Sequence, residues 1–192
     1  MKKFKRKVYK KGYLATVSLV NANCSGMNFD CKDLSLRSMN RINFNDASLN
    51  EADLTRSCLL NASFKNARME ETILYRACLL KADFTNTYLL YADFRKASLV
   101  CADFTSANLH STNLEGAKIQ GCKGNGKEIK NIEDPTYHIA YTKDVLAIGC
   151  EQHSHQEWKG FSDERIIAMD KDALGWWIQN KIKIINLLTN DS

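Results

Sequence analysis

The sequence lacks any long apolar run. Nowhere in its 192 residues does a stretch approach the roughly 18 consecutive apolar residues that a membrane-spanning helix needs. Its basic start, MKKFKRKVYKKGYLATVSLV, has neither the apolar core nor the small-residue cleavage site of a secretory signal. These absences predict a cytoplasmic protein without membrane contact.

The cysteines also follow no recognised spacing pattern. The seven cysteines match no disulfide framework and no zinc-binding CxxC pair, so we interpret them as reduced thiols. Cys150, His153 and His155 form a weak candidate metal site, but a structural zinc usually needs four ligands and only His138 is a further nearby histidine. Capping and packing at a helix start is the favoured interpretation. We therefore expect no metal and no cofactor.

Catalytic motifs are absent as well. No nucleophile, phosphate-binding loop or oxyanion motif accompanies the regularly spaced acids Asp53, Asp83, Asp93 and Asp103. Each of these acids precedes an apolar residue of a repeat, which predicts an outward, solvated carboxylate. We do not expect an enzyme.

Charge is unevenly distributed along the chain. Residues 1–16 carry seven Lys or Arg and no acid, residues 17–122 carry eleven groups of each sign, and residues 123–192 carry nine basic and eleven acidic groups. The segment 1–16 is therefore a basic N-terminal arm or cap. It could contact the phosphates of a nucleic acid, or it could be a solvated terminus.

What the sequence does contain is a period of five. Every fifth residue from Leu19 to Ile119 is apolar, and the residue two places earlier is small in most repeats. This period fits neither a helix nor a strand, because both would scatter the apolar residues over different faces. All of them can point inward only if the chain turns a corner in every repeat.

Four right-angle corners close a square coil of about twenty residues. Phe44, Phe64, Phe84 and Phe104 are spaced by twenty, so we expect them to stack inside the coil as one column of the core. Neighbouring columns are almost wholly aliphatic, and the alternation of large and small residues fills a narrow tube without voids. The period thus predicts stacked coils joined by β-type hydrogen bonds.

The repeat unit resembles that of a known family. Blocks such as Ala52-Asp53-Leu54, Ala82-Asp83-Phe84 and Ala102-Asp103-Phe104 are similar to the A-D/N-L/F-x-x unit of pentapeptide-repeat proteins. The resemblance implies a mainly β fold, a right-handed quadrilateral β-helix over residues 17–121. The best understood members of the family protect or inhibit bacterial DNA gyrase as dimers that imitate duplex DNA. DNA gyrase and a second copy of the chain are therefore candidate partners.

The earliest repeats depart from this unit. Met27, Lys32, Arg37 and Ile42 stand where later repeats carry a small residue. Side chains of this size cannot all occupy a tight inner corner. We expect the first coil and a half to be distorted, or to act as a cap.

A different organisation follows the repeats. Gly121, Gly124 and Gly126 end the period, so residues 122–136 are expected to be a linker. Residues 137–192 are expected to form a short hairpin and helices, a small α or α+β cap over the open end of the coil. The string from Ile148 to Trp158 resembles a tail that follows pentapeptide repeats in bacteriophage and bacterial proteins, which suggests a phage or prophage origin.

These features favour a non-catalytic protein-binding module, a phage or bacterial accessory protein that binds and modulates a host protein. A gyrase-binding DNA mimic and a structural spacer or assembly protein are the alternatives. Apolar residues at outward positions mark the expected interface for a protein partner or a homodimer, and we place them on one wall: Leu60, Leu80, Val100, Tyr88, Leu90 and Tyr91.

Overall fold

The computed structural model describes residues 18–132 and 134–190. The basic arm 1–16, and with it any contact to nucleic acid, lies outside the described residues. No helix within the described ranges is long and apolar enough to cross a bilayer.

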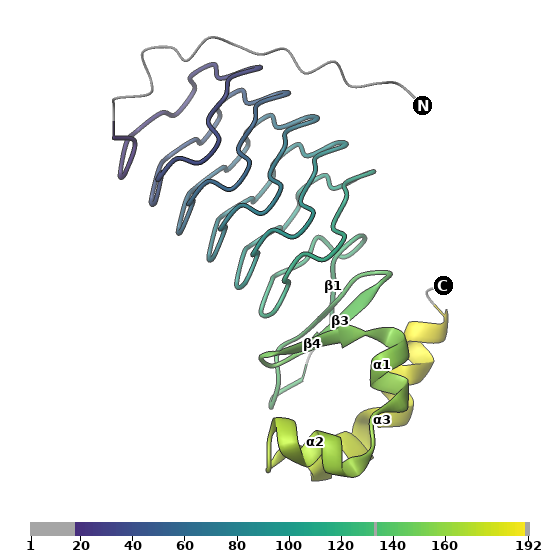
Figure 1. The fold of residues 1–192 in the computed structure, drawn as a ribbon. Helices are drawn as coiled ribbons and strands as arrows, with labels where there is room; N and C mark the ends of the chain where they lie inside the picture. Colours follow the sequence, from purple (N-terminus) through teal and green to yellow (C-terminus); the bar gives the residue numbers. More distant parts are fainter. Residues whose placement is uncertain (1–17, 133, 191–192) are drawn as a thin grey trace.

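The repeats form a solenoid of stacked coils (Figure 1). Isolated parallel β-bridges join residues twenty positions apart, from Asn23 with Asn43 through to Asp103 with Lys123. One coil therefore takes twenty residues, as the period of five predicts. Hydrogen bonds between successive coils hold the stack, as in the bond from the amide of Phe64 to the carbonyl of Asp83 at 2.7 Å.

Each coil has four corners, and every corner is a tight turn. At one of them the amide of Ala52 donates to the carbonyl of Leu49 at 3.1 Å, and the residue before Ala52, Glu51, has a φ of +57°. This φ is typical of the third residue of a type II turn, where Gly or Asn is preferred. Here Arg, Lys, Glu and Tyr also adopt it. From Asn21 to Cys101 the amide of each corner residue donates to the next coil, as Glu51 does to the carbonyl of Glu70 at 2.8 Å, which helps to offset the conformational cost.

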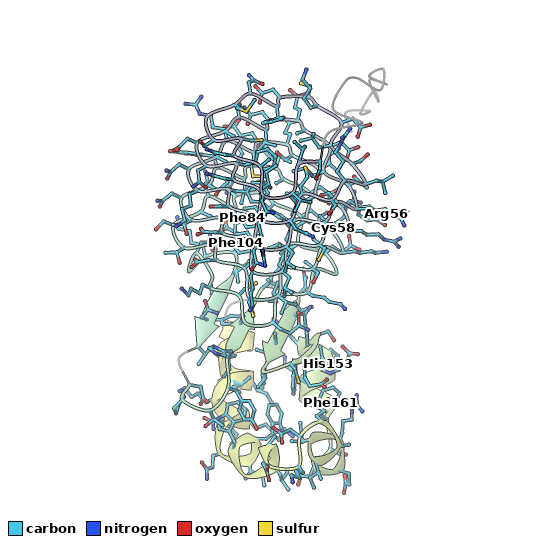
Figure 2. All side chains as sticks on the ribbon, turned by 90° about the vertical axis from the view of Figure 1, so that its left-hand side faces the viewer. Arg56, Cys58, Phe84, Phe104, His153 and Phe161 are labelled. Atoms are coloured by element: carbon cyan, nitrogen blue, oxygen red, sulfur yellow. The ribbon has the colours of Figure 1, made fainter. Side chains whose placement is uncertain are left out.

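The interior is a column of apolar side chains. Phe44, Phe64, Phe84 and Phe104 are fully buried and stacked, with ring centroids 5.5, 4.9 and 4.9 Å apart along the column. Figure 2 labels Phe84 and Phe104 inside the coils. The few buried hydroxyls at the small-residue position are satisfied by carbonyls. Thr87, for example, donates to the carbonyl of Phe64 at 2.7 Å.

The expected distortion of the first coil and a half is wrong. Every corner from Gly26 to Arg41 has the same positive φ as the later corners, and the bridges run without interruption. Met27 and Lys32 are exposed, Arg37 is partly exposed, and only Ile42 is buried. The large side chains are accommodated because most of them leave the interior while the backbone keeps its turn.

The acids and amides before each inward residue have a structural role that the sequence interpretation missed. Asp83 accepts hydrogen bonds from the amide of Thr85 at 3.0 Å and from its hydroxyl at 2.7 Å, and Asp53, Asp93 and Asp103 accept the equivalent amide bond. These four carboxylates are partly buried rather than fully solvated. They hold the chain as it enters the next corner, in the manner of an Asx turn.

An α+β module follows the coils, and the fold as a whole is mainly β with helices at the C-terminal end. Its four strands form one antiparallel sheet in the order β1-β2-β3-β4. β2 and β3 form the expected hairpin, but β1 lies inside the segment expected to be a linker. The elements are β1 (Lys130–Ile132), β2 (Ile139–Tyr141), β3 (Val145–Ile148), β4 (Glu151–Ser154), α1 (His155–Gly160), α2 (Asp163–Met169) and α3 (Ala173–Asn190).

The sheet closes the C-terminal end of the solenoid, with the helices on its far side (Figure 1). Ile129, Ala140 and Ala147 belong to the same buried cluster as the coil interior. The side chain of Gln152 accepts from the amide of Ile119 at 2.8 Å and donates to the carbonyl of Ala117 at 2.7 Å. It thereby pairs backbone groups of the last coil that would otherwise end as an open strand edge.

Helix starts in the module follow their sequence signals. Ser154 and Glu157, three residues apart, form a capping box at α1, and Ser162 caps α2. Trp158 and Trp177 are buried in a second apolar cluster, between the sheet and the helices. The module therefore has a core of its own in addition to its contact with the coil.

Candidate protein-interaction surface

Corners divide the outside of the solenoid into four walls, and two of them differ sharply in charge. We define the basic wall as residues 36–41, 56–61, 76–81, 96–101 and 116–121, each segment running from one corner to the next. The acidic wall consists of residues 26–31, 46–51, 66–71, 86–91 and 106–111. Two corners separate the segments of one wall from those of the other along the chain, so these walls lie on opposite sides of the square.

The apolar residues expected on a single wall are divided between these two. Leu60, Leu80 and Val100 lie on the basic wall, where each is partly buried. Tyr88, Leu90 and Tyr91 lie on the acidic wall, with Tyr88 and Tyr91 exposed to 52% and 58%. The expectation of one shared wall is wrong, because the chain turns at both Lys81 and Asn86 between Leu80 and Tyr88.

The basic wall carries seven positive side chains and no acid. The acidic wall carries five acids and one positive side chain, Arg68. Counting charges along the repeats conceals this separation, because the two signs are equal in number there. The basic residues are Arg37, Arg41, Arg56, Arg76, Lys81, Lys96 and Lys118, and the acids are Asp30, Asp46, Glu51, Glu70 and Glu71.

Local ion pairs lie on the other two walls. Lys65 pairs with Asp83 at 3.1 Å, and Arg95 pairs with Asp93 at 2.6 Å. On the basic wall no carboxylate is available at these positions, so its positive charges are not neutralised by acids of the same wall. Arg56 extends away from the coil in Figure 2.

The centre of the basic wall carries two thiols. Cys58 and Cys78 stand at a position where several segments of the other walls carry Asp or Asn, and they form a bridge pair with exposed side chains. After Cys58, the amide of Leu60 donates instead to the side-chain oxygen of Asn40 in the preceding coil, at 3.1 Å. Within the described residues, the amides of Leu80 and Val100 have no hydrogen-bond acceptor. The wall thus combines an apolar strip, two free amide donors and a margin of positive charge.

Cysteines inside the solenoid are core residues. Burial raises the pKa of the Cys122 thiol to about 12, and it also raises the pKa of Cys24. The Cys122 thiol donates to the carbonyl of Leu99 at 2.8 Å. These two thiols are therefore small apolar packing groups rather than reactive ones.

The weak metal candidate is not assembled as a binding site. No group of three His, Cys, Asp or Glu side chains in the described ranges is placed to hold a metal ion. His153 contacts Glu151 at 3.1 Å and packs edge-on against Trp158 and Phe161, while Cys150 is exposed. His153 is therefore engaged in packing within the module (Figure 2).

A cleft of about 690 Å³ separates the last coil from the β2–β3 hairpin. Leu114 in this cleft is only partly buried, unlike the fully buried Phe94 one coil earlier. The charged residues that line the cleft are Lys127, Lys130, Lys143, Glu115, Glu128 and Asp144. With three positive and three negative side chains, this lining has no net preference for a charged ligand.

Comparison with known proteins supports the interpretation of the repeats. The family described as pentapeptide repeats matches residues 61–89 and 87–123, with eight copies. No curated protein matches the sequence significantly.

Solved structures are similar to part of this chain. A pentapeptide repeat protein from the thylakoid lumen of Arabidopsis thaliana is 26% identical, with a TM-score of 0.51, over 52% of this chain and 69% of that one. QnrB1, a plasmid-mediated fluoroquinolone resistance protein, is 18% identical, with a TM-score of 0.47, over 56% of this chain and 68% of that one. The family match and the Arabidopsis structure imply a right-handed quadrilateral β-helix. The chain therefore carries pentapeptide repeats, which the family model matches over residues 61–123 of the solenoid.

Proposed function

We propose that this protein is a non-catalytic protein-binding module, and that its basic wall docks against an acidic surface of a protein partner. The observation that carries the proposal is the composition of that wall: seven positive side chains and no acid around the apolar strip of Leu60, Leu80 and Val100. Apolar centres with charged margins are typical of protein interfaces. By covering a surface of its partner, such a module would modulate what that partner can bind.

A protein partner fits this wall better than a nucleic acid does. Phosphate recognition needs positive and hydrogen-bonding groups, but it gains little from a central line of leucine and valine. An apolar strip is stabilising only against another apolar surface. The two free amides of Leu80 and Val100 add donors for carbonyl or carboxylate oxygens of a protein.

Rigidity strengthens the case for docking. Inter-coil hydrogen bonds of 2.8 Å fix Leu59, Leu79 and Leu99, the inward residues directly behind the strip. A partner therefore meets a preformed surface, and little ordering cost accompanies binding.

Imitation of duplex DNA toward gyrase has weaker support. A duplex mimic needs an acidic stripe along the rod, whereas the five acids of the acidic wall lie between residues 30 and 71, in the N-terminal half of the solenoid. A spacer role would use the length of the solenoid but would leave the charge separation without a purpose.

Affinity capture tests the proposal. The wild-type chain and the double variant Arg56→Glu, Arg76→Glu would be immobilised and exposed to a lysate of the source organism, and bound proteins would be quantified by mass spectrometry. We expect a bound protein with an acidic surface, at least ten-fold depleted on the variant. The control is Lys127→Glu, Lys143→Glu, which makes the same charge change on exposed lysines outside the wall.

Equal retention by the wild-type chain and by the basic-wall variant would refute the proposed docking surface. Depletion on the control variant to the same extent would show that overall charge, rather than this wall, governs capture. Circular dichroism of all three proteins would establish that they are equally folded.

A further inference from the structure

We infer that the acidic surface best fitted to the basic wall is the acidic wall of a second copy of this chain. This inference rests on the proposed function, since it names a partner for the same wall. The two walls lie on opposite sides of one solenoid and carry opposite charge. A second copy displaced sideways, without rotation, therefore brings its acidic wall against the basic wall of the first.

Corner positions match in such an arrangement. On one edge of the basic wall, successive coils place Arg56, Arg76 and Lys96 at the corner. The facing edge of the acidic wall in the second copy carries Glu51, Glu71 and Tyr91 at its corners.

The residue numbers of the two members of each pair differ by five, which corresponds to one quarter of a coil. At a coil spacing of about 4.8 Å, a quarter coil is an axial offset of only about 1.2 Å. Two arginines thus meet two glutamates, and Lys96 meets an exposed tyrosine ring in a position suited to a cation–π contact. The pairing needs no sliding of one solenoid along the other.

The opposite edge and the centre agree with the same alignment. Arg41 on the other edge of the basic wall faces Asp46, again five residues away in numbering. Between the edges, Leu80 and Val100 face the coil that carries Tyr88 and Leu90. The two apolar groups, which lie on opposite walls of one chain, therefore come together between two chains.

Charge also determines the symmetry of the association. A two-fold dimer through the basic wall would place seven positive side chains of each copy against those of the other, which is repulsive. Basic-to-acidic contact is instead heterologous, and every added copy leaves one basic and one acidic wall free. The expected product is an open row of parallel solenoids that grows with protein concentration and shortens with salt.

A charge exchange tests this arrangement. Variant one carries Arg56→Glu and Arg76→Glu, and variant two carries Glu51→Arg and Glu71→Arg. All four residues have a positive φ and are replaced by other non-glycine residues, so the backbone requirement of the corners is unchanged. In variant one both walls are negative at these corners, and in variant two both are positive.

Sedimentation velocity at low ionic strength gives the readout. We expect the wild-type chain to form species larger than a monomer in proportion to concentration, and each variant to associate at least ten-fold more weakly. An equimolar mixture of the two variants should recover wild-type association, since each wall then finds its opposite in the other variant. Circular dichroism confirms that each variant is folded.

Three results would overturn the inference: a wild-type chain that stays monomeric at all concentrations, a variant that associates as the wild type does, or a mixture that does not recover association. The first result is separable from failure of the proposed function. If the wild type is monomeric but Arg56→Glu, Arg76→Glu still loses a captured protein, the basic wall binds a different acidic partner and self-association is rejected.

Discussion

Phe84 occupies the middle of the stacked aromatic column, and its removal tests the description of the solenoid core. Its side chain is fully buried, its ring centroid lies 4.9 Å from those of both Phe64 and Phe104, and it meets Phe94 edge-on at 5.6 Å. The coils above and below are held by hydrogen bonds. Phe84→Ala therefore leaves a space that the neighbouring coils cannot easily close.

The expected cost follows from two contributions. Burial of a phenylalanine side chain stabilises a fold by about 1.5 to 3 kcal/mol. A residual cavity of roughly 100 Å³ adds about 2.4 kcal/mol at about 24 cal/mol per Å³. Phe84→Ala should thus lower the free energy of unfolding by about 4 to 5 kcal/mol.

Denaturant titration followed by far-ultraviolet circular dichroism measures this loss for the solenoid. Tryptophan fluorescence, recorded in parallel, reports the C-terminal module, since Trp158, Trp176 and Trp177 all lie there. The matched control is Tyr88→Ala, which removes a half-exposed ring from the next repeat and should cost under about 1 kcal/mol. Equal losses for the two variants would refute the assignment of inward and outward positions.

Three further predictions follow from particular contacts. Cys58 and Cys78 are bridge partners with exposed thiols, so a short bismaleimide should join them within one chain, as peptide mass spectrometry would show. The hydroxyl of Tyr137 donates a hydrogen bond to Asp170 at 2.7 Å, which raises the pKa of Tyr137 to about 12. The stabilisation from this bond is complete below pH 10 and is lost as the pH rises from 10 to 12. The difference in thermal midpoint between the wild type and Tyr137→Phe should therefore shrink over that range. Gln152→Ala should remove both hydrogen bonds to the last coil, cost about 1 to 3 kcal/mol and speed amide exchange at its edge.

Two of these predictions have a control within the chain, and the third has a pH profile that would refute it. Cys150 lies in the module and should not be joined to Cys58 by the short reagent. Gln156→Ala changes an exposed glutamine four residues from Gln152 and should leave exchange in the last coil unchanged. A constant wild-type advantage over Tyr137→Phe from pH 9 to 12 would contradict the assigned hydrogen bond.

Much of the solenoid was predictable because its repeat is both local and strict. An apolar residue at every fifth position is compatible with few backbones, and the twenty-residue spacing of Phe44, Phe64, Phe84 and Phe104 places them in one column. The regularity of the first coils was not predicted. A side chain such as Lys32 can turn outward without moving the backbone, so its size says little about the corner.

The C-terminal module was harder to predict, since its contacts are not periodic. Nothing in the spacing around Ile129 shows that its side chain enters the solenoid interior, or that Lys130–Ile132 forms β1 within an expected linker. The Gln152 contact with the last coil joins residues more than thirty positions apart. Such pairings depend on the folded arrangement and leave no local signal.

For the interaction surface, the sequence contained a signal that simple counting misses. Sorting residues by their position within twenty assigns Leu80 and Tyr88 to opposite walls and collects the positive charges on one of them. A period of five reveals the corners, but only the period of twenty distinguishes the walls. The structural role of Asp83 was missed for another reason: hydrogen bonding to the amide two residues later requires the corner geometry itself.

The strict corner after every fifth residue constrains how the chain can change length in evolution. Inserting or deleting one repeat would preserve the inward pattern, yet it would carry every later residue around by a quarter turn. Residues such as Lys96 would then leave the wall that carries Arg56 and Arg76, and the C-terminal module would face another direction. Only a change of twenty residues keeps all the walls intact, so related chains that use the same surface should differ in length by whole coils.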